Sequence, residues 1–178
     1  IMGNKSINNL PKITLGSSSP RRRDLLKKAG YEFEVVPPHL PEPTGLPASL
    51  SPVGYAQELA HFKASCVAES HRDKCVLGAD TIVAVNGKII GKATDAKHAV
   101  EMLTELSANP HKVITGITLL GPGEKFSIAA ETTIVTMRPM TEKEIQDYVD
   151  SGEWIGKSGA YAIQETADRF VEKIDGSF

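Results

Sequence analysis

The chain has 178 residues, a formal net charge of −2 at neutral pH and a hydrophobic content of 40%. This length suits a single domain with a sizeable core, and the composition is that of an ordinary globular protein. A slightly negative chain argues against broad binding to nucleic acid or to anionic membranes, so any preference for anions must come from a local cluster of cations. No apolar run in the sequence reaches membrane-spanning length.

The ends of the chain and its cysteines suggest a simple organisation. Residues 1–11 include three asparagines, a lysine and a serine, and we expect a flexible arm there, followed by one domain over residues 12–178. Cys66 and Cys75 lack the CxxC spacing of a zinc or redox motif. We therefore expect reduced thiols and a cytoplasmic protein.

The first predicted helix departs from the usual electrostatics of helix ends. An apolar strand at 13–15 leads through the serines 17–19 into Pro20, which suits the first helical position. Three arginines at 21–23 then occupy the first turn, where the helix dipole favours carboxylates. Backbone N–H groups, hydroxyls and guanidinium groups at such a turn bind phosphate well. We interpret this turn as a phosphate site; the alternative is a set of arginines exposed to solvent.

The next segments add one acid and one cation. A short strand at 32–36 is followed by a proline-rich loop at 38–52, which contains a single carboxylate, Glu42. A helix then extends from Pro52 to about residue 70, and Lys63 falls inside its apolar stripe. A lysine in that position either extends to the surface or points its ammonium group into a cleft.

An aspartate follows a buried strand directly. The apolar run 75–79 leads into Asp80, and a second apolar run at 81–85 ends at the hairpin signal Asn86-Gly87. A buried carboxylate is costly unless it is paired, hydrogen-bonded or bound to a cation. We interpret Asp80 as a functional carboxylate at a strand break; the alternative is a bulge or turn residue bonded to backbone N–H groups.

The second half of the chain alternates helices and strands. We expect a helix at 96–106, capped by Thr94 or Asp95, with Lys92 just before it. A strand pair at 112–120 and 126–137 follows, and then a helix with a capping box at 141–149. A loop spaced by glycines at 152–164 leads to a final strand at 170–174. The cations and the unusual Asp80 suggest a polyphosphate ligand with Mg²⁺, for which Asp80 and Glu42 would supply carboxylates. The chain lacks the P-loop, GxGxxG, HExxH and GxSxG motifs.

Four motifs occur in order along the chain: Ser17-x-Ser19-Pro20-Arg21-Arg22, Ala79-Asp80-Thr81, His111-x-Val113-x-Thr115-Gly116 and Gly156-Lys157-Ser158-Gly159-x-Tyr161-x-Ile163-Gln164. Together they resemble the Maf family of nucleoside triphosphate pyrophosphatases, which is historically tied to septum formation. The resemblance covers nearly the whole chain, from about residue 13 to residue 178. The Ala-Asp-Thr and Ile-Gln combination resembles the branch that acts on dTTP and UTP.

The resemblance implies an elongated α/β fold related to the inosine triphosphate pyrophosphatases, with a mixed sheet, flanking helices and a cleft between two lobes. It implies hydrolysis of a nucleoside triphosphate to the monophosphate and pyrophosphate with Mg²⁺ or Mn²⁺. Asp80 matches the catalytic proton acceptor. The expected substrate-binding residues are Ser17, Ser19, Arg21, Arg22, Lys63, Thr81, Lys92 and Gln164.

The chain also departs from the family pattern. Glu165 stands where a glycine usually follows Ile-Gln, and Gly91-Lys92-Ala93 stands where Glu-Lys-Pro is frequent. A C-terminal helix is expected after the last strand and is missing from the sequence. Two other functions stay open: an inosine or xanthosine triphosphate pyrophosphatase of the related fold, and a non-catalytic nucleotide-binding regulator of septum formation or cell division. We expect a nucleoside triphosphate substrate and neither a nucleic-acid nor a membrane partner, and homodimer formation stays open.

Overall fold

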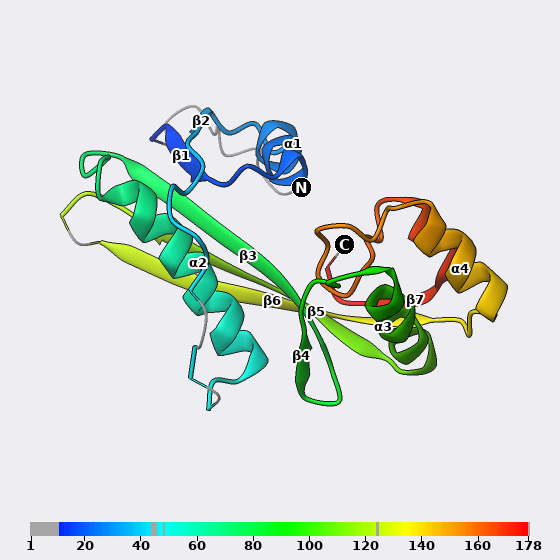
Figure 1. Cartoon of the computed structure of the whole chain (residues 1–178). Helices are drawn as coiled ribbons and strands as arrows, with labels where there is room; N and C mark the ends of the chain where they lie inside the picture. Colours follow the sequence, from blue (N-terminus) through cyan, green and yellow to red (C-terminus); the bar gives the residue numbers. More distant parts are fainter. Residues whose placement is uncertain (1–10, 44–45, 48, 124, 178) are drawn as a thin grey trace, which may run out of the picture. The chain divides into compact units, whose positions relative to one another are not determined.

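Figure 1 shows the computed structural model, which describes residues 11–43, 46–47, 49–123 and 125–177. Nearly all of the expected flexible arm at 1–11 therefore lies outside the described residues. In chain order the elements are β1 (Ile13–Gly16), α1 (Pro20–Lys28), β2 (Phe33–Val35), α2 (Pro52–Ala68), β3 (Cys75–Val85), β4 (Lys88–Ile90), α3 (Ala96–Ala108), β5 (His111–Leu120), β6 (Phe126–Met137), α4 (Glu142–Asp150), a 3₁₀ helix (Thr166–Phe170) and β7 (Val171–Asp175).

The strands form one mixed sheet in the order β2-β1-β3-β5-β6-β7, and β4 pairs with β3 outside this path. The first strand, β1, runs parallel to both of its neighbours, β2 and β3. The hairpin of β3 with β4 and the pair of β6 with β7 are antiparallel. The predicted α/β class with a mixed sheet is confirmed.

The chain divides into two compact units, each of which is described by itself. Unit 1 contains the chain up to Ser49 together with Gln57–Asp80 and Gly116–Ala129. Unit 2 contains Leu50–Ala56, Thr81–Thr115 and Ala130–Phe178. The long strands β3, β5 and β6 each contribute residues to both units, and the boundary in β3 falls between Asp80 and Thr81. A single domain over 12–178 stays a prediction.

Unit 1 is organised by the close approach of α2 to β3. Figure 1 shows α2 lying along this strand. A Cβ atom on Gly78 would lie 2.2 Å from the Ala60 carbonyl oxygen and 2.6 Å from the Ala64 nitrogen, so only glycine fits between the strand and the helix. Beside this contact, Ala64, Val67 and Val76 form a small buried cluster.

Unit 2 has the larger apolar core. Helices α3 and α4 pack against each other, and side chains from β3, both helices and the segment before the 3₁₀ helix are buried together. The largest fully buried side chains there include Tyr148 and Phe170, whose rings meet edge to face at 6.2 Å between centroids. The sequence pattern of α3 and α4 predicted these buried faces.

Several local signals were predicted correctly. Asn86 and Gly87 have φ angles of 50° and 78°, as a type I′ hairpin requires. Asp95 caps α3 by accepting a hydrogen bond of 2.8 Å from the His98 nitrogen. Helix α4 begins with a complete capping box between Thr141 and Glu144. Hydrogen bonds from Arg138 and from the Thr141 backbone lower the pKa of Glu144 to about 2.

One expectation was wrong. Asp80 does not lie at a strand break or bulge, because β3 continues without interruption from Cys75 to Val85. The final strand, expected at 170–174, is found at Val171–Asp175, and a 3₁₀ helix precedes it.

Helix α1 buries none of its residues, and Leu25 is 65% exposed. No helix within the described ranges combines the length and the apolar character needed to cross a bilayer.

The glycine at 78 provides a direct test of the packing in unit 1. We expect Gly78→Ala to lower the free energy of unfolding by about 3 kcal/mol, since the new methyl group collides with helix backbone that cannot move away easily. Urea denaturation measures this change. Gly91→Ala is the matched control, because a Cβ atom there meets nothing within 4 Å. Equal stability of the two variants would contradict the close approach.

Candidate active site

The expected phosphate site begins at the carboxyl end of β1. Ser17 follows the strand directly and is 4% exposed. Its Oγ accepts hydrogen bonds from the Ser19 nitrogen at 3.2 Å and from Arg22 Nη1 at 3.1 Å. Ser17 therefore fixes the turn into α1 and also holds the Arg22 side chain, so two predicted substrate residues are organised by a third.

The first turn of α1 has the expected cationic character. Ser19 is the N-cap residue, but its side chain accepts no capping hydrogen bond from the described residues. Arg21 and Arg23 are exposed, whereas Arg22 is half-buried. Burial lowers the pKa of Arg22, and the nearby charge of Arg21 lowers it further, while the carboxylates of Asp80 and Glu42 oppose this change. The guanidinium group of Arg22 thus lies within electrostatic range of both predicted metal ligands.

The centre of the site is an ion pair between Lys63 and Asp80. Asp80 is 7% exposed, and its Oδ1 contacts Lys63 Nζ. The same ammonium group lies 2.8 Å from Glu42 Oε1. The Lys63 side chain is 13% exposed, so this lysine does not extend to the surface. The buried aspartate is compensated by a cation from the helix, which neither of the two interpretations of Asp80 anticipated.

Backbone geometry places this pair beside Ser17. Gly16 of β1 pairs with Gly78 of β3 in the parallel ladder. Ser17 is one residue past this pair along the chain, and Asp80 is two residues past it, in the same direction. A Cβ atom on Gly16 would lie 3.2 Å from the Lys63 carbonyl oxygen, so the end of β1 also approaches α2 closely. Ligands of open α/β sheets bind outside the carboxyl ends of parallel strands, and Ser17 lies at such an end, that of β1.

The remaining predicted residues, Thr81, Lys92 and Gln164, belong to unit 2. Thr81 Oγ1 shares a hydrogen bond of 3.0 Å with Thr115 Oγ1, and the Thr81 carbonyl accepts a bond of 3.3 Å from Ser158 Oγ. Lys92 forms a β-bridge with Ser158. Gln164 is exposed at the end of the same loop. Ser158 therefore connects two of the three residues.

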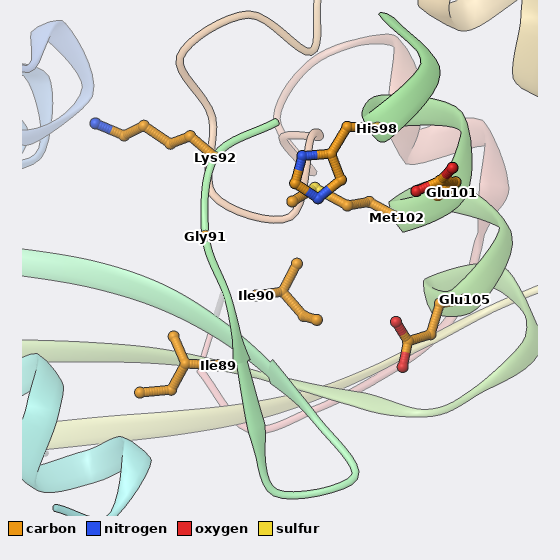
Figure 2. Close-up of a pocket in the computed structure, with 8 residues that line it drawn as sticks. All are labelled: Ile89, Ile90, Gly91, Lys92, His98, Glu101, Met102 and Glu105. Atoms are coloured by element: carbon orange, nitrogen blue, oxygen red, sulfur yellow. The ribbon is translucent and has the colours of Figure 1, made fainter. Parts of the chain in front are cut away.

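A hollow of about 350 Å³ lies beside Lys92. Ile89, Ile90 and Met102 form its apolar part, and His98, Glu101 and Glu105 extend into it from one face of α3. Figure 2 shows that the Lys92 ammonium group points away from these carboxylates and from the hollow. An acidic wall does not suit a polyphosphate, so the hollow is not the expected substrate site.

The side chains that could hold a metal ion are few. The two predicted ligands, Asp80 and Glu42, converge through their shared contact with the Lys63 ammonium group. In the described part of the chain, no group of three or more His, Cys, Asp and Glu side chains is placed to hold a metal ion. Two carboxylates fit a Mg²⁺-type ion that keeps water and phosphate oxygens as its other ligands, and they do not fit an all-protein cage.

Sequence reasoning missed the contacts that hold the loop after α4. Lys157 forms an ion pair with Glu165, the residue found where the resemblance predicted a glycine. The Nε2 atom of His111 lies 2.6 Å from the Tyr161 hydroxyl, and both side chains are buried. His111 and Tyr161 belong to the motifs that carry the family resemblance, but no periodicity or spacing indicates that positions 50 residues apart pair. Opposite charges at 157 and 165 were the one available signal.

These parts define a class of protein. An α/β chain with a cationic helix start at the end of a parallel strand, next to a lysine-paired carboxylate, has the parts of a binding site for a phosphorylated ligand. The model of the family described as "Maf-like protein" matches residues 12–178. This chain belongs to the Maf family.

Two relatives of known name agree with this assignment. A dTTP/UTP pyrophosphatase of Carboxydothermus hydrogenoformans is 42% identical over 168 residues, which cover 94% of this chain and 89% of the relative. A dTTP/UTP pyrophosphatase of Pelotomaculum thermopropionicum is 39% identical over 170 residues, which cover 95% and 88%. Among solved structures, the Staphylococcus aureus Ham1 protein is 17% identical with a TM-score of 0.49, and the match covers 71% of each chain.

The ion pair at the centre of the site predicts a large effect on stability. Lys63→Met should lower the free energy of unfolding by about 3 kcal/mol, because it leaves a buried carboxylate without its lysine partner. The double variant Lys63→Met/Asp80→Leu should recover most of this loss, since both charges are then absent. Lys74→Met is the matched control: it breaks the more exposed pair with Glu34 and should cost much less. If urea denaturation shows Lys63→Met to be as stable as Lys74→Met, the Lys63–Asp80 pair does not stabilise the fold in this way.

Proposed function

We propose that this chain hydrolyses dTTP and UTP to the nucleoside monophosphate and pyrophosphate. The observation that carries the proposal is the buried carboxylate of Asp80, held by Lys63 next to Ser17 and Arg22. Tight phosphate binding needs cations but has no use for a buried acid among them, whereas hydrolysis needs a base. The names of the two relatives described above support the choice of dTTP and UTP.

The phosphate chain binds at the start of α1. Its oxygens accept hydrogen bonds from N–H groups in the first turn, which the Ser19 side chain does not cap, from the Ser17 hydroxyl and from Arg21 and Arg22. These groups are largely organised before the substrate arrives, because Ser17 already holds both the turn and the Arg22 guanidinium. Preorganised donors stabilise charge that develops on the leaving pyrophosphate.

Asp80 acts as the proton acceptor. A water molecule attacks the α-phosphorus in line with the bridging oxygen, its proton passes to the Asp80 carboxylate, and the bond between the α-phosphorus and that oxygen breaks. The pyrophosphate leaves with the bonding electrons. Lys63 holds the carboxylate in place before the attack through the ion pair.

A divalent ion, Mg²⁺ or Mn²⁺, completes the proposed site. Asp80 and Glu42 are the residues that would hold it, and their charge and hard oxygen atoms suit either ion. When bound, the ion neutralises charge on the phosphate oxygens. The nucleoside end is assigned to unit 2, where Thr81 and Gln164 contact the base and Lys92 contributes a further cation.

A panel of triphosphates tests this function. Purified protein is incubated with dTTP, UTP, CTP, ITP and XTP in Mg²⁺ or Mn²⁺, with and without excess EDTA, and pyrophosphate release is measured. We expect dTTP and UTP to exceed the purine nucleotides in kcat/KM by about tenfold or more, and EDTA to abolish turnover. Preference for ITP or XTP would replace the proposed substrate class. Tight dTTP binding without turnover in either metal would indicate a non-catalytic binder.

The arginines of the first turn should differ in their effects. Arg21→Ala should lower kcat/KM for dTTP by about 100-fold, since it removes a charged donor to the phosphate chain. Arg23→Ala is the matched control in the same turn; it should change kcat/KM by no more than about twofold, as expected for a surface charge outside the site. Similar losses in the two variants would show that the turn acts only through its overall charge.

A further inference from the structure

The segment Ser158–Gln164 of unit 2 is joined to three separate elements. Ser158 Oγ donates to the Thr81 carbonyl of β3, and the Gly159 nitrogen donates to the Gly91 carbonyl at 2.9 Å. At the middle of the segment, the Tyr161 side chain reaches His111 at the start of β5. The segment is therefore held at its beginning and its centre, and its last residue is the exposed Gln164.

The contact with β5 is a buried and directional hydrogen bond. His111 is 1% exposed and Tyr161 is 5% exposed, and their rings meet edge to face at 5.5 Å. His111 Nδ1 lies 3.2 Å from the Asn109 carbonyl, which only accepts, so this nitrogen carries the proton. His111 Nε2 is then the acceptor of the bond, and the Tyr161 hydroxyl donates it over 2.6 Å. Burial lowers the pKa of His111, which maintains this neutral form.

The backbone beside Tyr161 is strained. Ala160 has a φ of 60°, a left-handed conformation that costs a residue with a Cβ atom about 1 kcal/mol or more. Gly159 is also left-handed, at 71°, and a Cβ atom there would lie 2.9 Å from Val83 Cγ2. Such strain persists only where the surroundings impose it, and it concentrates at functional sites. The contacts of Ser158, Gly159 and Tyr161 are the ones that impose it here.

We propose that the His111–Tyr161 hydrogen bond is a positioning device that sets base selectivity by fixing the Ser158–Gln164 segment. This inference rests on the proposed function, in which Gln164 and Thr81 contact the base. Tyr161 lies three residues before Gln164, and Ser158 at the other end of the segment holds the Thr81 carbonyl. Fixing the segment therefore fixes both base contacts. His111 and Tyr161 act through Gln164 and Thr81 and do not touch the substrate themselves.

A purely structural role makes a different prediction. If the bond only stabilised unit 2, its loss would affect every ligand alike through the fraction of folded protein. If the bond positions the segment, its loss weakens recognition of the base and leaves binding of the phosphate chain intact, because the residues assigned to the phosphates in unit 1 make no use of it. Inorganic tripolyphosphate is a suitable probe, since it carries the phosphate chain without a base.

The test compares Tyr161→Phe with the unchanged protein. We expect KM for dTTP to rise by about five- to tenfold and the preference for dTTP over ITP to fall by a similar factor. The kcat for dTTP and the inhibition constant of tripolyphosphate should each change by less than about twofold. The double variant His111→Leu/Tyr161→Phe removes both partners and avoids a buried unpaired nitrogen, so it should fold well and show the same loss of selectivity. Tyr31→Phe, which removes a tyrosine hydroxyl from unit 1, is the matched control and should leave selectivity unchanged.

The outcomes separate this proposal from the proposed function. Unchanged dTTP preference in active Tyr161→Phe and in the double variant overturns the positioning role, and so does a parallel loss of dTTP and tripolyphosphate binding. Absence of turnover of every triphosphate by the unchanged protein contradicts the proposed function instead. In that case, Kd values for dTTP and ITP measured by calorimetry replace the KM values, and the same selectivity comparison applies.

Discussion

The structure of unit 1 depends on the compensation of one buried carboxylate. Asp80 lies within a continuous strand, where an isolated charge would be strongly destabilising. The compensating ammonium group comes from Lys63 on α2, and it reaches Asp80 because the helix lies unusually close to the strand. Gly78 permits this approach, since its missing Cβ leaves room for the helix backbone at Ala60 and Ala64, on either side of Lys63. Two residues further along the strand, the lysine meets the aspartate.

The same close approach organises the phosphate-binding residues. Gly16 lies opposite Gly78 in the parallel ladder and also contacts the backbone of α2. Ser17 follows at once and holds both the turn into α1 and the side chain of Arg22. Two glycines at one level of the sheet thus bring two cations and a carboxylate to the carboxyl end of β1 and the middle of β3. Helix α1, which buries none of its residues, is held in this arrangement by its first turn.

Much of this could be predicted from the sequence because the signals are local. The capping residues of α3 and α4, the Asn86-Gly87 turn and the proline start of α1 each depend on a few neighbouring residues. The cations and Asp80 stood out because each conflicts with its local surroundings. What could not be predicted depends on distant pairs. The partner of Asp80 is 17 residues away and that of Tyr161 is 50 residues away, and hydrophobic periodicity contains no information about such pairs.

The interpretation of Asp80 shows the limit clearly. When only the neighbouring residues are considered, a carboxylate between two apolar runs suggests that the strand is interrupted there. The strand is uninterrupted because the cost of the charge is offset by a side chain on another element. The inference that Asp80 is unusual was therefore sound, but the predicted backbone was wrong. In unit 2 the same limit hid the role of Ser158, which connects Thr81 and Lys92 through contacts across the fold.

The central claim is that Asp80 provides the base for hydrolysis and contributes little to holding the nucleotide. The most direct measurement is the turnover and the dTTP affinity of Asp80→Asn, determined in parallel in saturating Mg²⁺ or Mn²⁺ with a folded protein verified by circular dichroism. The account predicts that kcat falls by about 1,000-fold, as expected for the loss of a positioned base, while the Kd for dTTP stays within about threefold. Full activity in this variant would contradict the account and remove Asp80 from the mechanism.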